Sequence, residues 1–392
     1  MKKIHILQVL TLNRNSGIAS FIMNIYQYID REKVQFDFLT WVVDKNLPVY
    51  NNIIKNMGGN IYTIPYYKNN FYGFIKNSYK ILFENNITIL HCHEFLASIP
   101  ILYLGKKAGI PIRIAHSHNP TIDQVLKRKL AYICHPIFKH YATKFLACSQ
   151  DSGHFLFGEK ANYSILKNGI IVSKFQYSAT TRNQLRQKLG LENKFIIGNI
   201  GRMVTQKNQS FLLYSFAKLI ENHPNFHLIL IGKGNLESNL RHQVELLGIK
   251  EHVLFLGVRD DICDLLNIMD VFVFPSIYEG LGIVLIEAQA NGLPCIVSDC
   301  VPKEVQLNSN CHFVSLKSNY DIWNKLILDA NRIDSEKAIS NVNNAGYNII
   351  QSAKILEELY LSENSKLHKR KQNISNNDKT IKDCRVKNEN KT

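Results

Sequence analysis

The sequence predicts an α/β protein of two doubly wound domains, each a parallel sheet covered by helices on both faces. A length of 392 residues exceeds what one ordinary hydrophobic core accommodates. Short apolar runs alternate along the chain with longer amphipathic runs, as strands and helices do in such domains. This alternation occurs twice and breaks near residues 168–180, where we expect the two domains to join.

The expected strands fall into two series. The first contains "HILQVL", "QFDFLTWV", "NIYTIP", "ITILHCH", "IRIAHSH" and "KFLACS", and the second contains "FIIGNIG", "FHLILIG", "HVLFLGV", "VFVFPS" and "PCIVSD". We therefore expect one domain at 1–172 and another at 173–345. Apolar positions at helical spacing predict a closing helix over 346–362. Residues 363–392 lack aromatics and are basic, so we expect a disordered tail there.

The charge of the chain is unevenly distributed. Residues 1–172 hold 20 Lys/Arg against 9 Asp/Glu, whereas residues 173–362 hold 18 against 19. The basic first half is either a solvated surface or faces an anionic partner, such as phospholipid headgroups or a phosphorylated acceptor. No RNA- or DNA-binding module is recognisable, so we expect no nucleic acid partner.

Other features exclude whole classes of protein. No stretch approaches the roughly 20 apolar residues that a membrane-spanning helix needs, and the N-terminus reads as a first strand and not as a secretion signal. The eight cysteines form no CxxC pair, which favours a reducing compartment. A P-loop, a complete dinucleotide fingerprint and a G-x-S-x-G elbow are all missing from the sequence.

Two histidine pairs end expected strands of the first domain: His91 with His93, and His116 with His118. Histidines at such spacing can ligate a metal. Polar residues are expected at strand ends on any ligand-binding hypothesis, so we favour hydrogen bonding to a substrate and expect no metal.

Two motifs of the second domain carry chemistry. In "NIGRMVTQKN", Arg202 and Lys207 follow a strand, and two fixed cations at a strand-to-helix turn suit a diphosphate. In "SIYEGLGIVLIEAQANGLP", Glu279 lies in a glycine-rich loop and Glu287 in the helix that follows. Carboxylates accept paired hydrogen bonds from vicinal hydroxyls. Glycosidase carboxylates flank a bond from opposite sides, which makes a hydrolase pair less attractive here.

Together these motifs resemble the retaining glycosyltransferases of the GT-B fold, and more narrowly the family-4 enzymes of capsular polysaccharide and exopolysaccharide synthesis. The resemblance rests on E-x7-E in "EGLGIVLIE", "FPS" before it, "AQANGLPCIVSD" after it and "GR…QKN" upstream. It covers about residues 2–362. It implies two Rossmann-like domains facing a cleft, with the acceptor bound by the first and the nucleotide sugar by the second.

The resemblance also implies roles for individual residues. Arg202 and Lys207 would bind the donor diphosphate, Glu279 the transferred sugar and Glu287 the ribose. Further donor contacts are implied for the backbone of Leu281, Gly282 and Ile283, and for Gly232, Val258 and Arg259 near the nucleobase. In the first domain, Gly17 belongs to the loop that approaches the donor phosphates, and His118 resembles the histidine beside the reacting sugar.

Two departures from the family pattern stand out. The usual Gly-Gly-x-Glu loop is Ser16-Gly17-Ile18-Ala19 here, which puts any acceptor role of the missing acid in doubt. "NGII" also replaces "NGID" at the domain joint.

We expect a retaining hexosyltransferase that needs no cofactor or metal. Its partners would be a nucleotide-sugar donor, with a UDP-sugar favoured, and a glycan or lipid-diphosphate-linked acceptor. We expect a cytoplasmic location, and residues 123–144 are the segment that would touch an anionic membrane on its inner face. A sugar-nucleotide epimerase and a catalytically weakened binding protein are the alternatives.

Overall fold

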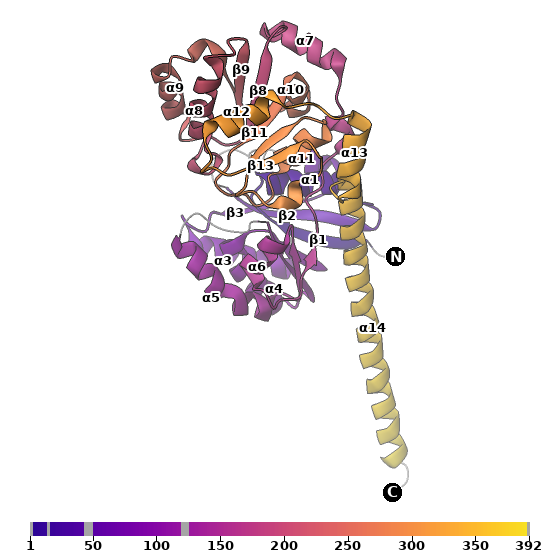
Figure 1. Cartoon of the computed structure of the whole chain (residues 1–392). Helices are drawn as coiled ribbons and strands as arrows, with labels where there is room; N and C mark the ends of the chain where they lie inside the picture. Colours follow the sequence, from indigo (N-terminus) through magenta and orange to yellow (C-terminus); the bar gives the residue numbers. More distant parts are fainter. Residues whose placement is uncertain (1–2, 14–15, 43–49, 119–124, 390–392) are drawn as a thin grey trace. The chain divides into compact units, whose positions relative to one another are not determined.

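The computed structural model describes residues 3–13, 16–42, 50–118 and 125–389, which form two compact units (Figure 1). One unit comprises the described residues up to Leu166 together with those from Ala353 onward. The other comprises Lys167–Ser352. Helix α14 (Ile349–Glu389) begins in the second unit and continues in the first.

The first unit is built on a seven-stranded sheet of order β3-β2-β1-β4-β5-β6-β7, in which all paired strands are parallel. Its strands are β1 (Ile4–Val9), β2 (Val34–Val42), β3 (Ile61–Pro65), β4 (Ile89–Cys92), β5 (Ile112–Ser117), β6 (Lys144–Ala147) and β7 (Ser164–Ile165). Its other helices are α1 (Gly17–Tyr28), α2 (Asn51–Asn56), α3 (Phe71–Glu84), α4 (Phe95–Lys107), α5 (Val125–Tyr141) and α6 (Gln150–Phe157).

Helices cover both faces of this sheet, as the alternating sequence pattern predicts. On one face, strand residues such as Leu7 and Leu90 form a core with side chains of α3, α4, α5 and α6. On the other face, Phe36 stacks on Tyr26 of α1 and meets Tyr360 of α14 edge-on. Helices α1 and α14 therefore pack on the face opposite to α3–α6.

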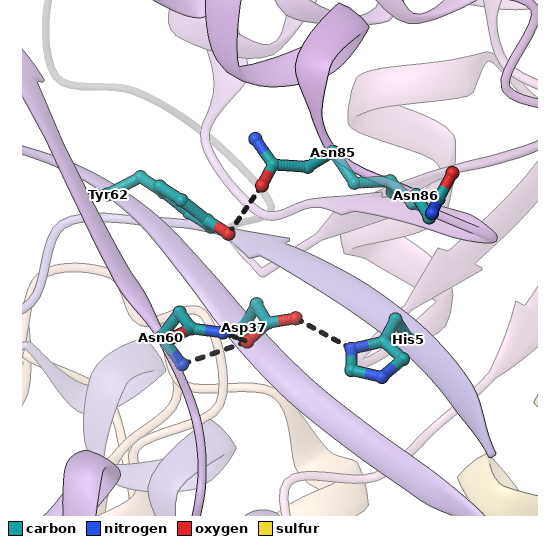
Figure 2. Close-up of a pocket in the computed structure, with 7 residues that line it drawn as sticks. His5, Asp37, Asn60, Tyr62, Asn85 and Asn86 are labelled. Carbon is teal, nitrogen blue, oxygen red and sulfur yellow. Dashed lines mark hydrogen bonds and ion pairs between the residues drawn. The ribbon is translucent and has the colours of Figure 1, made fainter.

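A small polar pocket lies toward the amino ends of β1, β3 and β4 (Figure 2). The buried carboxylate of Asp37 accepts hydrogen bonds from the backbone and side-chain amides of Asn60 at 2.8 and 2.9 Å. Its other oxygen lies 3.0 Å from His5 Nδ1. These contacts join three neighbouring strands, so the pocket has a structural role at the end of the sheet remote from the strands' carboxyl ends.

The second unit is built on a six-stranded parallel sheet of order β10-β9-β8-β11-β12-β13. Its strands are β8 (Phe195–Ile200), β9 (Phe226–Ile231), β10 (Val253–Gly257), β11 (Val271–Phe274), β12 (Cys295–Ser298) and β13 (Cys311–Val314). Its helices are α7 (Ala179–Leu189), α8 (Gln209–Ile220), α9 (Glu237–Leu246), α10 (Ile262–Ile268), α11 (Ile283–Ala290), α12 (Tyr320–Leu328) and α13 (Ser335–Asn344), and the short 3-10 helices are η1 (Val172–Phe175), η2 (Thr205–Lys207), η3 (Lys250–His252) and η4 (Lys303–Val305).

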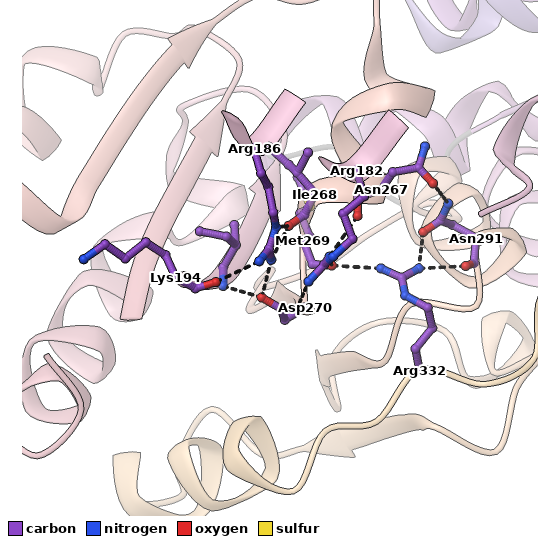
Figure 3. A network of polar contacts seen from close by, with 10 residues as sticks. Arg182, Arg186, Lys194, Asn267, Ile268, Met269, Asp270, Asn291 and Arg332 are labelled. Carbon is purple, nitrogen blue, oxygen red and sulfur yellow. Dashed lines mark hydrogen bonds and ion pairs between the residues drawn. The ribbon is translucent and has the colours of Figure 1, made fainter. Parts of the chain in front are cut away.

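Arginines anchor helix α7 to the start of β11 (Figure 3). Arg182 and Arg186 both pair with the carboxylate of Asp270, and Arg186 Nη2 lies 2.6 Å from Asp270 Oδ2. Arg332 donates to the carbonyls of Met269 and Asn291 at 2.8 Å. This network fixes the segment that leads into β11, the strand that precedes the second sequence motif.

The C-terminal helix differs from the expectation of a short helix followed by a disordered tail. Gly346, with φ of 80°, follows the end of α13, and α14 starts only at Ile349. The helix then continues to Glu389, through the residues for which we expect disorder. Residues 349–389 contain neither glycine nor proline, and Lys366 pairs with Glu363 one turn away. The segment has no apolar face to bury, which is why we expect disorder there. Its local helix propensity nevertheless extends the helix.

None of the helices in the described part of the chain combines the length and the apolar character that crossing a membrane requires.

Candidate functional site

The sheet of the second unit has one switch point, between β8 and β11. From β8 the chain proceeds outward through β9 and β10, and it then returns to place β11 on the other side of β8. Ligands of doubly wound sheets bind outside the carboxyl ends of the strands at such a point. Arg202 and Lys207 follow β8, and Glu279 and Glu287 follow β11, so both sequence motifs lie at this switch point.

The two motifs meet in a direct ion pair. Lys207 Nζ donates to Glu279 Oε1 at 2.6 Å. The Lys207 side chain is 14% exposed and that of Glu279 is 7% exposed, so the pair is largely shielded from water. Charge-assisted hydrogen bonds of this kind are short and fix both side chains.

Backbone contacts hold the two loops together beside this pair. The Ile277 N–H donates to the carbonyl of Gln206 at 2.8 Å, and the Gln206 side-chain amide donates to the Tyr278 carbonyl at 3.0 Å. Asn208 has a φ of 53°, the left-handed region that asparagine tolerates better than most residues, and it turns the chain from η2 into α8. Lys207 is therefore presented by a short, internally bonded turn.

Phe274 and Gly282 shape the surroundings of the ion pair. Lys207 Nζ lies 4.7 Å from the centre of the Phe274 ring, a cation–π distance. Gly282, with φ of 74°, precedes α11, and a Cβ there would lie 3.2 Å from the Phe274 ring and 3.9 Å from Glu279 Cγ. A glycine is thus needed both for the backbone turn and for the close approach of the loop.

The first turn of α11 offers free backbone donors. Within the described part of the chain, the N–H groups of Leu281, Gly282, Ile283 and Val284 have no acceptor. Helix N-termini with such groups bind anions. The Leu281 side chain is buried in the hydrophobic core, so only its backbone is available to a ligand.

Glu287 lies about one turn inside α11 and is partly buried. Burial raises the pKa of its carboxyl group from 4.5 to about 7. No described residue donates a hydrogen bond to this carboxylate or pairs with it. An unpaired carboxyl group at this place is available to hydroxyl donors of a ligand.

Strands β9 and β10 lie on the other side of β8. The predicted residues on this side are less closely connected to the pair of Lys207 and Glu279. Gly232 follows β9 with φ of 128°, and a Cβ there would clash with the Gly201 carbonyl oxygen. Gly232 therefore allows the turns after β8 and β9 to pack. Arg202 is exposed, and its guanidinium has no ion-pair partner among the described residues.

Val258 and Arg259 follow β10, two strands away from β8. Val258 is exposed, and Arg259 pairs with Asp261, with Nε 2.8 Å from Oδ1. This pair raises the pKa of the guanidinium. Val258 and Arg259 thus share the carboxyl edge with Arg202 and Lys207, but in the described part of the chain no hydrogen bond or ion pair joins them to those residues.

The remaining predicted residues, Gly17 and His118, belong to the first unit. Gly17 begins α1, and Ser16 caps this helix by accepting a hydrogen bond from the Ala19 N–H at 3.2 Å. The loop that departs from the family pattern therefore serves as an ordinary helix cap. His118 follows β5, and its ring meets Phe21 of α1 edge-on at 6.3 Å, which places it beside the first turns of that helix.

The imidazole cluster around His118 has the close spacing of a metal site. His91, His93 and His116 each offer a nitrogen within 4.8 Å of the others. Both ring nitrogens of His93 are hydrogen-bonded, to His118 and to Gln8. Burial lowers the pKa of all four histidines, that of His118 to about 3. The four rings are thus neutral, and hydrogen bonds join His93 to His118 and to Gln8.

Several residues that shape these sites were not predicted from the sequence. Phe274 and Gln206 lie within the quoted motifs, but nothing in the sequence shows that they contact Lys207 or the Tyr278 carbonyl. Gln8 could have been noticed as an amide in an otherwise apolar strand. Tyr360 could not, because 352 residues separate it from Gln8, to which it is hydrogen-bonded.

Comparison with known proteins gives the family. A family model described as "Glycosyl transferases group 1" matches residues 181–341. The putative glycosyltransferase EpsF of Bacillus subtilis (strain 168) is 32% identical over 380 residues, which are 93% of this chain and 98% of the relative. The chain belongs to the group 1 glycosyltransferases.

One further relative in sequence and one solved structure are similar to this chain. A UDP-Gal:alpha-D-GlcNAc-diphosphoundecaprenol alpha-1,3-galactosyltransferase of Escherichia coli is 28% identical over 306 residues, covering 72% of this chain and 77% of the relative. The crystal structure of Anabaena Alr3699/HepE in complex with UDP and glucose matches with a TM-score of 0.73 at 18% identity, covering 92% of this chain and 100% of that one. This glycosyltransferase therefore has the predicted GT-B fold of two Rossmann-like domains.

Proposed function

We propose that this glycosyltransferase moves a hexose, with retention of configuration, from a UDP-sugar to a hydroxyl group of a glycan or lipid-diphosphate-linked acceptor in bacterial surface polysaccharide synthesis. The observation that carries the proposal is the shielded pair of Lys207 and Glu279 at the switch point of the second sheet. A cation for the diphosphate and a carboxylate for sugar hydroxyls thereby lie side by side.

The donor would extend from this pair in both directions along the carboxyl edge. Arg202 and Lys207 would contact the diphosphate, together with the free N–H groups at the start of α11. Glu279 would hold the transferred sugar. Glu287 would accept hydrogen bonds from the ribose hydroxyls, because its carboxylate has no described protein donor.

The remaining donor contacts would come from β9 and β10. Gly232 would lie near the base, where its lack of a side chain lets the turns after β8 and β9 pack together. The exposed residues Val258 and Arg259 would lie next to the base. Base contacts through this loop would involve mostly the backbone, because Asp261 already occupies the Arg259 guanidinium.

Chemically, the bond between the anomeric carbon and the diphosphate oxygen breaks, and a bond from the acceptor oxygen to the same carbon forms on the same face. The acceptor hydroxyl proton passes to the departing phosphate oxygen, so the reaction balances without a separate base. Arg202 and Lys207 would stabilise the charge that develops on the leaving diphosphate. Two side-chain cations and the α11 N-terminus can supply this stabilisation, and for this reason we propose that no metal is required.

The similar proteins support the donor and acceptor classes. The Escherichia coli relative is named for a UDP-sugar donor and a lipid-diphosphate acceptor. The Anabaena structure contains UDP and glucose. Neither likeness distinguishes among hexoses, so the proposal is limited to a hexose.

Attachment to an anionic membrane surface is part of this proposal. The neighbouring helices α3, α4 and α5 expose aromatic and aliphatic side chains, namely Phe71, Tyr72, Tyr79, Phe83, Tyr103, Tyr132 and Ile133. The same helices expose Lys76, Lys80, Lys106, Lys107 and Lys139. Aromatic rings beside lysines are typical of surfaces that bind membrane headgroups. The predicted segment 123–144 contributes α5, although residues 123–124 and the side chains up to residue 131 lie outside the described part of the chain.

A nucleotide screen followed by a product assay tests the function. Thermal stability is measured with UDP, GDP and ADP, because a ligand that binds only the folded state raises stability. We expect UDP to give the largest shift in the wild type and a much smaller one in Lys207→Ala. Failure of all three nucleotides to shift the wild type would contradict a nucleotide-sugar enzyme.

The product assay separates the alternatives. Incubation with UDP-sugars and a lipid-diphosphate acceptor should give a glycosylated acceptor whose new linkage keeps the donor's anomeric configuration. Conversion of the UDP-sugar into its epimer without acceptor would identify an epimerase. Binding of UDP without any turnover would identify a non-catalytic binding protein.

A further inference from the structure

One face of the first sheet carries an unusual set of buried polar side chains. Gln8 of β1 pairs in register with His91 of β4, His93 follows the carboxyl end of β4, and His116 lies near the carboxyl end of β5. His118 follows on the same face of β5, and Tyr360 reaches the set from α14. All of these residues belong to the first unit and are buried. Buried polar groups of this number require mutual hydrogen bonds.

Four of these residues form one continuous chain of hydrogen bonds. Tyr360 Oη lies 3.0 Å from Gln8 Nε2. Gln8 Oε1 lies 2.8 Å from His93 Nε2, and His93 Nδ1 lies 2.9 Å from His118 Nε2. Tyr360 Oη also lies 2.6 Å from His91 Nδ1. The side-chain hydroxyl of α14 is thus connected to His118 through Gln8 and His93.

The Gln8 amide sets the direction of every bond in this chain. Its carbonyl oxygen can only accept, so the His93 Nε2 atom must carry a proton. A neutral imidazole has one N–H, so His93 Nδ1 is an acceptor, and His118 Nε2 must donate to it. At the other end, the Gln8 NH₂ group donates to the Tyr360 oxygen, which leaves the tyrosine proton for His91 Nδ1.

We propose that Tyr360, Gln8 and His93 are positioning residues that hold His118 in its Nε2–H tautomer, so that His118 Nδ1 accepts a hydrogen bond from a hydroxyl group of the substrate. The identity of that substrate as a sugar rests on the function proposed above. His118 Nδ1 is buried and has no hydrogen-bond partner among the described residues. A hydroxyl group that reaches it would satisfy an acceptor that the described protein leaves unused.

Two further observations support this assignment. Desolvation by burial lowers the pKa of His118 to about 3, so the ring remains neutral and keeps one acceptor nitrogen. The His118 ring also lies 4.0 Å from the ring of His116 and 6.3 Å from that of Phe21, contacts that limit its rotation. The tautomer is therefore coupled to a fixed ring orientation.

The chain of hydrogen bonds from Tyr360 to His118, which we call the relay, also links His118 to the packing of α14. Tyr360 contributes the only hydroxyl group in the four-residue chain. The helix that carries it begins in the second unit and continues in the first. A change in how α14 packs on β1 would remove the Tyr360 oxygen from Gln8, and the preference for one Gln8 orientation would weaken.

Long-range ¹H–¹⁵N spectra of histidine-labelled full-length protein test the relay without requiring turnover. These spectra distinguish the two neutral tautomers, and His118→Ala assigns the signal. We expect His118 in the Nε2–H tautomer in the wild type and a mixture of tautomers in Gln8→Leu. Tyr360→Phe, which removes one oxygen and preserves the ring, should give a partial change in the same direction.

A matched control separates the relay from general destabilisation. Gln35 is a second buried glutamine of the same sheet, and it also pairs with a tyrosine, Tyr26, but with none of the four histidines. Gln35→Leu should lower stability and leave the His118 spectrum unchanged. An Nδ1–H tautomer of His118 in the wild type would overturn the proposal, since it requires the opposite orientation of Gln8. So would a His118 signal that does not respond to Gln8→Leu.

Kinetics then test the substrate contact. With a turnover assay in hand, Gln8→Leu should lower kcat/KM for the sugar donor at least tenfold and leave the affinity for UDP alone unchanged. A normal tautomer response combined with unchanged kcat/KM would show that the relay exists but does not serve the substrate. Absence of turnover in the wild type would refute the proposed function and leave the tautomer result standing.

Discussion

Lys207 Nζ and Glu279 Oε1 lie 2.6 Å apart, although 72 residues separate the two side chains in the sequence. The pair joins the loop after β8 to the loop after β11 at the switch point of the sheet. Both side chains are largely buried, so each charge depends on the other for compensation. Loss of one partner of such a pair leaves an unpaired buried charge, which typically costs about 3–5 kcal/mol.

The first prediction concerns Lys207→Ala. We expect kcat/KM to fall at least tenfold, because the variant loses a cation from the proposed diphosphate site and leaves Glu279 without its partner. Steady-state kinetics measure the effect, and circular dichroism shows whether the fold survives. Lys325→Ala, which removes an exposed lysine of α12 in the same unit, is the control and should retain wild-type kinetics. Wild-type turnover by Lys207→Ala would contradict the diphosphate assignment.

A double-mutant cycle extends this prediction to the pair. Glu279→Gln and Lys207→Met each disturb the ion pair, and the double variant removes both charges. We expect the double variant to be more stable than the sum of the single effects predicts, since it leaves no unpaired buried charge. Urea unfolding of the four proteins measures the coupling. Simple additivity would show that water or other groups compensate each charge.

The next prediction concerns the stability cost of Glu287. Burial raises the pKa of this carboxyl group from 4.5 to about 7. Between these two values the folded chain holds the proton and the unfolded chain does not, so stability falls as the pH rises through this window. At pH 8 the wild type buries a charge that Glu287→Gln lacks. We expect the variant to be more stable there by on the order of 1–3 kcal/mol, with a smaller difference at pH 5.

Thermal unfolding of both proteins from pH 5 to pH 8 measures this difference. Glu336→Gln, which changes an exposed glutamate of α13, controls for the general effect of exchanging a carboxylate for an amide. If Glu287 also binds the ribose, UDP affinity should rise with pH in the wild type as the carboxylate forms. Equal UDP affinity in wild type and Glu287→Gln at pH 8 would show that Glu287 does not contribute to donor binding.

The sequence-based predictions and the structure agree most closely for features that the local sequence pattern determines. Apolar strands separated by amphipathic runs predict both parallel sheets, and the two motifs follow strands that are neighbours in the second sheet. Side-chain partners are harder to predict, because they depend on which loops converge. The pairing of Arg259 with Asp261 and the contact of Lys207 with Phe274 illustrate this limit.

The relay from Tyr360 to His118 shows a second limit. Periodicity places Tyr360 on a helix but gives no information on which strand that helix covers. The prediction that the C-terminal helix ends at residue 362 is also wrong. It considers only the apolar area that the segment can bury, and it gives no weight to the helix propensity of an uninterrupted run, which α14 follows to Glu389. Long-range packing and local propensity thus account for the two main departures.

Gly232→Ala tests the packing of the turns after β8 and β9. A Cβ at this position would clash with the Gly201 carbonyl oxygen, and the φ of 128° disfavours any residue with a side chain. We expect a loss of at least about 2 kcal/mol in unfolding free energy together with loss of UDP binding. Gly190→Ala is the matched control, since Gly190 has a φ of 67° and a Cβ added there would have no neighbour within 4 Å. That variant should lose only about 1 kcal/mol and keep UDP binding.

The final prediction concerns the surface of α3, α4 and α5. Tyr132 and Ile133 of α5 are 57% and 67% exposed, and the neighbouring helices α3 and α4 also expose lysines. Replacing both by serine removes apolar area that could enter the headgroup region, and the lysines remain to attract anionic lipid. We expect binding to anionic vesicles to weaken severalfold in a sedimentation assay, and added salt to weaken the remainder. Tyr214→Ser, at an exposed tyrosine of α8 in the other unit, should bind as the wild type does. If the wild type fails to sediment with anionic vesicles at physiological salt, this surface does not bind membranes, and the exposed rings of α3 and α5 require another explanation.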